Sequence, residues 1–252
     1  MLYAHTKTVA LSVIVVVLAG CGGTHLEVPT PTRELYSSLD PVAIHALSTF
    51  ELYVVGSVTL NDGNPEGLIL ASETGGRTWR RLAVEVHDLG RTTFQTVHFA
   101  DRLRGWVGGL RVDDRGRTRG VVFRTEDGGN HWRETMLVQD PNVLISQIHS
   151  IAFVSDLEGA VVLSILAPGA KEPRQTAYVT RDAGRTWSVA SYREVAKVPF
   201  VDHSRSMLDV KRGFRLRKSK FPGIHVIEST VSEGKDWMPI SEISVAALNT
   251  YY

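Results

Sequence analysis

The sequence predicts an all-β fold of the propeller type, with four repeats of about 50 residues that each form a four-stranded antiparallel blade. Three observations lead to this prediction. A turn that ends in tryptophan recurs four times, and a pattern of a large apolar residue followed by glycine recurs with the same period. Between them lie short runs rich in valine, isoleucine and aromatic residues, separated by turn-forming residues. No stretch after residue 43 shows the period of an amphipathic helix.

The recurring turn occupies residues 72–79, 125–132, 180–187 and 230–237, so its tryptophans are 50 to 55 residues apart. The opening Ser or Thr can hydrogen-bond the turn's own backbone, and the glycine at the fifth position can adopt a positive φ. The closing tryptophan is expected to pack between neighbouring sheets. The third position is aspartate only in the two central copies. The residues predicted to shape these turns are Ser72, Gly76, Trp79, Thr125, Asp127, Gly129, Trp132, Thr180, Asp182, Gly184, Trp187, Thr230, Gly234 and Trp237.

The second pattern places a large apolar residue six positions before a glycine, or before a tyrosine in the first repeat. Its best-formed copy is residues 97–109. Two independent patterns that keep one period over four copies exclude coincidence. The pairs are Leu47 and Tyr53, Phe99 and Gly105, Phe153 and Gly159, and Met207 and Gly213.

The tryptophan turns resemble the Asp-boxes, or BNR repeats, of sialidases, sortilin-type receptors and many other propellers. Together with the Phe-x-Asp…Gly-Trp-x-Gly-Gly strand of the second repeat, they are most similar to the photosystem II assembly and stability factor family, over residues 44–245. The resemblance implies a propeller whose Asp-boxes are scaffold on the rim. The photosystem role belongs to particular phototrophs, so we expect the fold alone to be shared.

The first residues predict export and lipid attachment. An uncharged apolar run at 8–20 has the length of a signal-peptide core, shorter than a bilayer span. It leads into Cys21, the only cysteine, through Leu-Ala-Gly, which resembles the lipobox of bacterial lipoproteins. We therefore predict a signal peptide at 1–20, the lipidated Cys21 and a flexible tether at 21–43, and a propeller-like domain at 44–252. Gly22 favours the outer membrane over the inner one, so the expected location is periplasmic or at the cell surface.

Four repeats are few for this family. Only 15 residues follow Trp237, and residues 22–42 lack both patterns, so we expect no fifth repeat. We expect a small closed ring, because an open arc would expose apolar faces of its terminal sheets. An open arc, and a homodimer that completes a larger ring, are the alternatives.

Composition and motifs exclude several classes of function. Lys and Arg total 28 and Asp and Glu 27, so charge gives no reason to expect a nucleic acid partner. The nine histidines lack close ligand spacing, and no phosphate loop, nucleophile elbow or zinc-protease motif occurs. The Phe/Tyr-Arg-Ile-Pro segment of sialidases is also absent. We predict no catalytic residue, no metal and no cofactor apart from the lipid on Cys21.

Two groups of residues are candidates for binding a partner. Propeller geometry brings the loops between repeats, and the loops between the second and third strands, to the face opposite the tryptophan turns. The last repeat also has a strand with one basic face, suited to anionic lipid or an acidic partner. The alternatives are solvated loops and an edge strand protected from pairing by charge. The loop candidates are Asp113, Asp114, Arg115, Asp202, His203 and Arg205, and the basic strand contributes Arg215, Arg217 and Lys218.

The function that these features predict is that of a non-enzymatic, membrane-anchored lipoprotein that binds a protein partner through one propeller face, as an interaction or assembly module. The alternative is a glycan-binding or sialidase-like carbohydrate-active propeller. A glycan site needs aromatic side chains, and the candidate loops supply few, such as Phe200 and Phe221.

Overall fold

The computed structural model describes residues 36–84, 91–138, 144–191 and 203–249. Contacts divide the chain into residues 1–32 and 33–252, and all described residues belong to the second unit. The predicted signal peptide and Cys21 therefore lie outside the described residues, as does Asp202.

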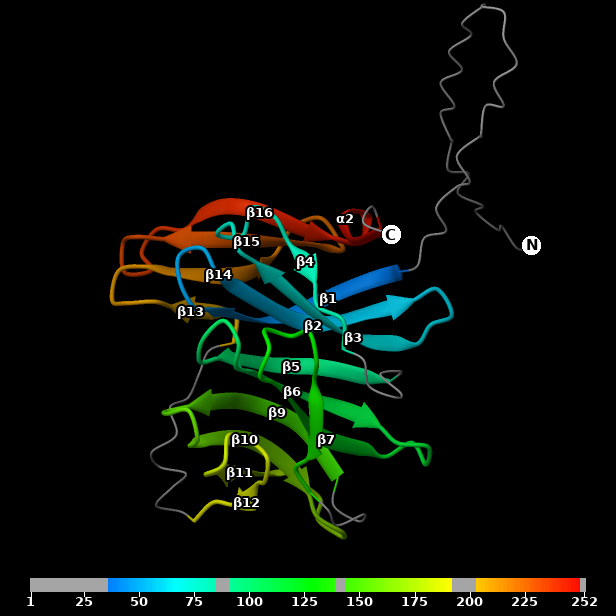
Figure 1. The fold of residues 1–252 in the computed structure, drawn as a ribbon. Helices are drawn as coiled ribbons and strands as arrows, with labels where there is room; N and C mark the ends of the chain where they lie inside the picture. Colours follow the sequence, from blue (N-terminus) through cyan, green and yellow to red (C-terminus); the bar gives the residue numbers. More distant parts are fainter. Residues whose placement is uncertain (1–35, 85–90, 139–143, 192–202, 250–252) are drawn as a thin grey trace, which may run out of the picture. The chain divides into compact units, whose positions relative to one another are not determined.

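Each repeat forms one four-stranded antiparallel sheet whose strands pair in chain order (Figure 1), so the all-β prediction is confirmed. Beyond the strands, the structure describes one short helix, α2 (Val245–Asn249). The first sheet contains β1 (Tyr36–Ala46), β2 (Leu52–Leu60), β3 (Pro65–Ser72) and β4 (Arg80–Arg81), and the second β5 (Thr92–Phe99), β6 (Gly105–Val112), β7 (Thr118–Thr125) and β8 (Arg133–Met136). The third contains β9 (Leu144–Phe153), β10 (Gly159–Leu166), β11 (Arg174–Thr180) and β12 (Ser188–Val189), and the fourth β13 (Arg205–Met207), β14 (Gly213–Lys218), β15 (Ile224–Thr230) and β16 (Met238–Ser244).

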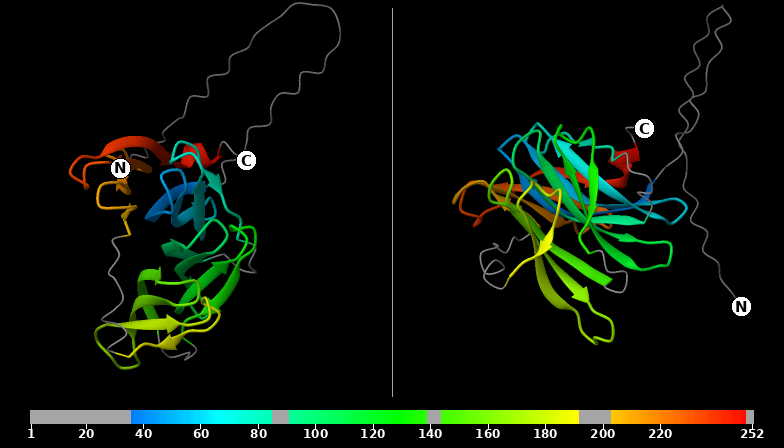
Figure 2. Two further views of the ribbon diagram at one scale, coloured as in Figure 1. Left: turned by 60° about the vertical axis from the view of Figure 1, so that its left-hand side comes forward. Right: turned by 60° about the horizontal axis from the view of Figure 1, so that its bottom comes forward.

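The sheets pack face to face like propeller blades, in the spatial order fourth, first, second, third (Figures 1 and 2). Burial of apolar side chains holds each of the three interfaces together. The described residues of the third and fourth sheets share no such core. The described sheets thus form an open arc, and the expectation of a closed ring was wrong. The interfaces contain, in that order, Val54 with Phe214, Val107 with Ile69, and Val161 with Trp106.

A row of ion pairs joins the turns of neighbouring sheets, and it too stops between the third and the fourth sheet. Glu51, in the turn before β2, pairs with Arg102 in the equivalent turn of the second sheet. Arg104 Nη1 then lies 2.6 Å from Asp156 Oδ2 in the turn of the third sheet. The next pair in the series would join Glu158 to Val210 of the fourth sheet, which is apolar and 81% exposed.

The folded region begins earlier than predicted. β1 starts at Tyr36, so the boundary expected at residue 44 lies inside a strand, and the predicted tether includes buried Tyr36 and Leu39. The prolines suggested a tether, but Pro41 sits at a register shift in β1, which an edge strand tolerates. Its partner is Gly56, where a Cβ atom would stand 2.5 Å from Pro41 Cα. A side chain at Gly56 would therefore displace β1.

The second repeating pattern is shifted by one residue in the first sheet. Strand pairing aligns Ala46 and Leu52 with Phe99 and Gly105, so the predicted pair of Leu47 and Tyr53 was wrong. In the second sheet the Phe99 ring covers Gly105, whose Cβ would lie 2.4 Å from it. The first sheet exchanges the large and small partners. The exchange keeps the combined volume similar, which core packing requires, but hides the alignment in the sequence.

Among the described residues, no helix combines the length and the apolar character that a membrane span requires.

Candidate functional site

The tryptophan turns connect the third and fourth strands of each sheet and share one hydrogen-bond pattern. The opening hydroxyl accepts from the glycine N–H at the fifth position, at 2.9–3.2 Å in all four copies. The side-chain oxygen at the third position accepts from the N–H at the seventh, at 2.8–2.9 Å. Thr74 and Ser232 make this second bond with a hydroxyl where Asp127 and Asp182 use a carboxylate. The outer copies therefore keep the turn although they have lost its aspartate.

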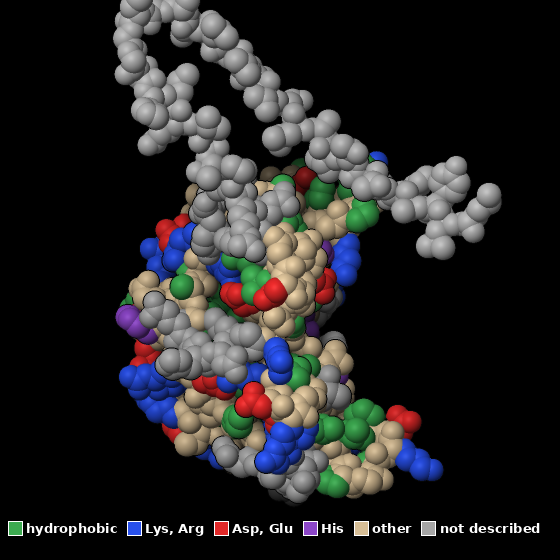
Figure 3. Space-filling model, turned by 90° about the vertical axis from the view of Figure 1, so that its right-hand side faces the viewer, with side chains coloured by type: hydrophobic (Ala, Val, Ile, Leu, Met, Phe, Trp, Pro, Cys, Tyr) green, Lys and Arg blue, Asp and Glu red, His purple; other side chains and the backbone are tan. Residues whose placement is uncertain are grey.

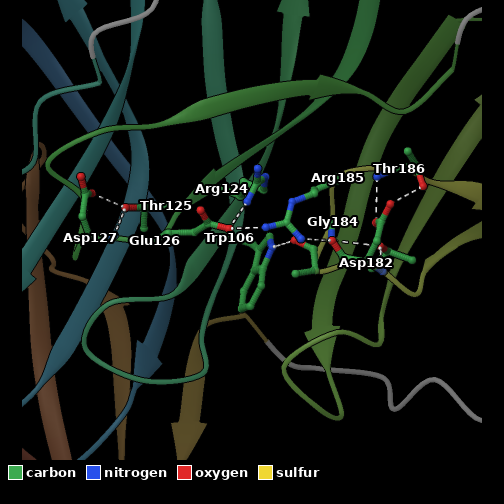
Figure 4. A network of polar contacts seen from close by, with 11 residues as sticks. Trp106, Arg124, Thr125, Glu126, Asp127, Asp182, Gly184, Arg185 and Thr186 are labelled. Carbon is green, nitrogen blue, oxygen red and sulfur yellow. Dashed lines mark hydrogen bonds and ion pairs between the residues drawn. The ribbon is translucent and has the colours of Figure 1, made fainter.

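Two of these turns also connect neighbouring sheets (Figure 4). Trp106 Nε1 on β6 donates to the Ala183 carbonyl oxygen in the third turn at 2.9 Å. Glu126, in the second turn, accepts from Arg124 Nη1 at 2.5 Å and from Arg185 Nη2 at 3.0 Å. The bonds of Trp106 and Arg185 run between the second sheet and the third. The hydroxyl and carboxylate groups at the first and third positions of the turns are therefore bonded within the protein itself.

The described loop candidates lie in two places, a turn of the second sheet and the start of the fourth. Asp113 lies in the turn between β6 and β7, where its carboxylate contacts the side chains of Arg117 and Arg119. The Arg117 N–H is the main cause that holds the pKa of Asp113 well below its ordinary value. Asp114 and Arg115 follow in the same turn, whereas Arg205 belongs to β13 of the fourth sheet. His203 lies beside the first sheet, and its carbonyl oxygen accepts from Ile44 N–H at 2.8 Å.

The three predicted basic residues lie on two sides of β14. Arg215 and Arg217 project from the side of the fourth sheet opposite Phe214 and Leu216, which pack against the first sheet. Lys218 lies on the other side, with its Nζ 3.3 Å from Asp40 Oδ1 on β1. β14 is the second strand of its sheet, so the edge-strand alternative was wrong.

We call the side of the fourth sheet that carries Arg215 and Arg217 the open face. Three positions on it can be aligned with the other sheets through strand pairing. In the first three sheets these positions are buried and apolar, and they face the preceding sheet of the arc. In the fourth sheet all three are charged. The aligned sets are Ile44, Val97, Ile151 and Arg205; Val54, Val107, Val161 and Arg215; and Leu70, Phe123, Tyr178 and Glu228.

The charged residues of the open face form one cluster around Glu228, whose side chain is 5% exposed. Arg215 Nε donates to Glu228 Oε2 at 2.5 Å, and Arg217 donates to Oε1 through Nε at 3.1 Å and Nη2 at 3.0 Å. In the pairing of β13 with β14, Arg205 lies directly opposite Arg215. Burial raises the pKa of Glu228, but the bonds from Arg217 and Arg215 outweigh it, so the net pKa lies below its ordinary value. Glu228 is therefore held as a carboxylate.

Two apolar side chains border this cluster. The Arg215 guanidinium lies over the Trp237 ring, 4.6 Å from its centroid. The ring thus supports the guanidinium by a cation–π contact. Met207 covers Gly213 at the end of β13 and is 42% exposed.

The sequence singled out Arg205, Arg215 and Arg217, but in two unrelated groups. It missed Glu228 and the part that Trp237 plays beside Arg215. The missing signal was present in the repeats, because charged residues stand in the last copy where the other copies have valine, isoleucine, leucine or an aromatic residue. The described residues contain no cluster of three or more metal-ligating side chains.

Charges of both signs also lie elsewhere on the described surface. Figure 3 shows Lys and Arg side chains interspersed with Asp and Glu over one face of the molecule. On the open face, Arg215 and Arg217 share the carboxylate of Glu228.

No family model matches the sequence, and no curated protein matches it either. Similar solved structures include a protein of unknown function from Dyadobacter fermentans, with 16% identity and a TM-score of 0.48 over 82% of this chain and 64% of that one. A Hadza microbial sialidase has 15% identity and a TM-score of 0.44 over 83% and 47%. An α-L-arabinofuranosidase from Fusarium graminearum has 13% identity and a TM-score of 0.45 over 83% and 68%. The chain thus spans less than two thirds of the first two proteins.

Proposed function

We propose that this chain is a binding module that recognises a protein partner through the open face of its fourth sheet. The observation behind this proposal is the change of three aligned positions from buried apolar residues to Arg205, Arg215 and Glu228. Burying this cluster against the third sheet would remove ions from water at several kcal/mol each. The charges therefore keep the arc open and leave a polar sheet face for another molecule.

The proposal includes attachment to a membrane through lipid on Cys21, which rests on the sequence of residues 8–21. Such an anchor would hold the module at a membrane surface, where a partner meets it in two dimensions. Several acyl chains give durable anchoring, whereas a single chain gives weak and reversible attachment.

The chemistry of the open face favours binding over catalysis. A general acid or base works best with a pKa near the working pH. Glu228 has a pKa below its ordinary value and is occupied by two arginines, so it is poorly suited to exchange protons. Its evident role is to hold Arg215 and Arg217 in place.

The second candidate is the carbohydrate-active propeller. The three arginines of the open face favour it, because guanidinium groups also bind the carboxylates of acidic sugars. Trp237 disfavours a sugar-binding site, because Arg215 covers one face of the ring on which a sugar would stack. The sialidase and the arabinofuranosidase, at TM-scores of 0.44 and 0.45, give no support to either function.

A photo-crosslinking experiment tests the proposal. We would replace Met207 with p-benzoylphenylalanine in the full chain, in the cells that produce it, and irradiate. Met136 on β8 is the matched control, because it is also an exposed methionine, 40% against 42%, but belongs to the second sheet. We expect a defined adduct from position 207 and none from position 136. Equal labelling at both positions, or none at 207, would contradict a docking role for the open face.

A hydrolysis assay separates the two candidates. Purified protein would be incubated with fluorogenic glycosides of sialic acid and of uronic acids. We expect no turnover. Turnover by the native protein that is lost in Arg215→Gln would contradict the binding module and support a carbohydrate-active enzyme.

A further inference from the structure

Where the fourth sheet packs on the first, the turns carry arginines without the acidic partners that equivalent residues have elsewhere. Glu51, Arg104 and Arg212 hold equivalent positions, because the carbonyl oxygen of each accepts from the N–H four residues earlier. Glu51 and Arg104 each pair with a residue of opposite charge in the next sheet of the arc. The residue that stands in this place for Arg212 is Thr49 of the first sheet, which is uncharged.

The tryptophan turns show the same difference. Arg185, at the sixth position of the third turn, donates to Glu126, at the second position of the turn in the preceding sheet. Arg77 holds the sixth position of the first turn, and the second position of the turn in the fourth sheet is Val231, which is apolar. Arg77 has no hydrogen bond or ion pair with any described residue. Both arginines of this interface therefore lack a carboxylate across from them.

A cavity of about 250 Å³ lies between these turns. Thr49 and Val231 line it together with the two arginines, and no acidic side chain of the described residues does so. Buried Phe214 is part of the lining, and Phe50 and Val231 are 61% and 66% exposed. The cavity thus combines two guanidinium groups with an apolar surface.

We propose that this cavity binds a small carboxylic acid that carries an aromatic or branched aliphatic group, with Arg77 and Arg212 contacting the carboxylate. The two parallel N–H groups of a guanidinium match the two oxygens of a carboxylate. The bound acid supplies the negative charge that Glu126 and Asp156 supply to the equivalent arginines. The site is separate from the open face, because it lies on the side of the fourth sheet that packs against the first.

The size of the cavity favours a small molecule over a lipid. Pockets for drug-sized ligands measure roughly 300–1,000 Å³. A cavity of about 250 Å³ therefore suits a ligand of about the size of an amino acid. An apolar group bound between Phe50 and Val231 would remove exposed apolar surface of both residues from water.

Saturation-transfer difference NMR tests the inference. The protein is the purified full chain in detergent, and detergent alone is the blank. The probe is 3-phenylpropionate, and its neutral amide, 3-phenylpropanamide, is the control ligand. We expect saturable binding of the acid, and binding of the amide that is about tenfold weaker or less. Equal binding of acid and amide, or no binding of the acid, would overturn the inference.

Arg77→Gln is the variant least expected to disturb folding, because this side chain has no polar partner among the described residues. It should weaken binding of 3-phenylpropionate about tenfold. The matched control, Lys235→Gln, removes the same charge from the sixth position of the fourth turn, outside the cavity lining, and should change binding less than twofold. Equal weakening by the two variants would mean bulk electrostatics and would overturn the inference.

Val231→Glu fills the site from within the chain. It gives Arg77 the acidic partner that Glu126 gives Arg185, so it should compete with the ligand and weaken its binding about tenfold. Val231→Gln has the same length without the charge and should weaken binding much less. Unchanged binding in Val231→Glu would overturn the inference. Binding of the peptide acetyl-Gly-Glu-Phe-Gly-amide but not of 3-phenylpropionate would overturn it in favour of a protein segment.

Discussion

His45 on β1 and His98 on β5 meet between the first and second sheets, with ring centroids 4.9 Å apart. Burial lowers the pKa of His45 to about 4 and that of His98 to about 3, against an ordinary value of 6.5. Both rings thus stay neutral in the folded protein while the unfolded chain takes up protons. The stability that they contribute is complete above pH 6.5 and decreases as the pH falls towards 4.

We therefore predict that the free energy of unfolding falls between pH 7 and pH 5, and that His98→Phe reduces this fall by about 2 kcal/mol. Phenylalanine fills similar space next to Trp106 and Phe153 but cannot titrate. Urea unfolding of both proteins at the two pH values measures the difference. Parallel pH dependence in the two proteins would show that the pair is not the source.

The fourth position of the tryptophan turns is a second site where one residue decides stability. It has a φ of 61° at both Ala183 and Glu233, and glycine occupies it in the first two copies. Residues with a Cβ atom are strained at this φ by roughly 1–2 kcal/mol.

We predict that Glu233→Gly raises the free energy of unfolding by a few tenths to about 1 kcal/mol, because glycine's greater freedom in the unfolded chain offsets part of the relieved strain. Gly128→Ala, at the equivalent position of the second copy with a φ of 73°, should lower it by about 1 kcal/mol. Urea titrations of both variants provide the check. Opposite signs support the assignment, and a loss in both would contradict it.

At the scale of the element, β1 is where sequence and structure differ most. The tether was inferred from prolines and low apolar content, yet β1 contributes Tyr36 and Leu39 to the core between the first and fourth sheets. One-residue register shifts, one of them following Pro41, break the alternation that would have revealed a strand. The turns were predictable because they depend on local hydroxyl and glycine chemistry. The start of β1 was not, since it depends on pairing with distant β2.

A truncation tests this boundary. A chain that begins at residue 33 should fold, whereas one that begins at residue 44, as the sequence suggested, should lose cooperative unfolding. The shorter chain lacks most of β1 and leaves its share of the core exposed. Circular dichroism melts of the two chains would distinguish them. Equal melting temperatures would mean that residues 36–43 contribute nothing to stability and belong to the tether, as the sequence suggested.

At the scale of the whole molecule, the number of repeats could be read from the sequence but their closure could not. Periodicity reports what the copies share, and closure depends on where they differ. Arg205, Arg215 and Glu228 break the apolar pattern only in the fourth copy, and their alignment needs the strand register that the structure provides. The same residues define the candidate site. Sequence analysis therefore placed Arg205 and Arg215 in two separate groups of candidates and missed Glu228.

Restoring the pattern should change the behaviour of the whole molecule. We predict that Arg205→Ile, Arg215→Val and Glu228→Leu together cause self-association, because they create an apolar sheet face with no partner. The control combines Arg205→Gln, Arg215→Gln and Glu228→Gln, which removes the charges but stays polar and should leave the oligomeric state unchanged. Size-exclusion chromatography with light scattering measures both. A triple apolar variant with the native mass would mean that other features keep the arc open.

The arc has a further consequence for the order of the chain. Because the fourth sheet packs on the first, the neighbours in space run fourth, first, second, third, although synthesis produces the fourth sheet last. Leu248 on α2 packs in one core with Tyr36 of β1, so residue 249 can be joined to residue 36 by a short linker. A circular permutant that starts at residue 203 would then be made in the order in which its sheets stack. Each sheet of such a protein would meet its neighbour as soon as it emerged, and no sheet would wait for a partner from the far end of the chain.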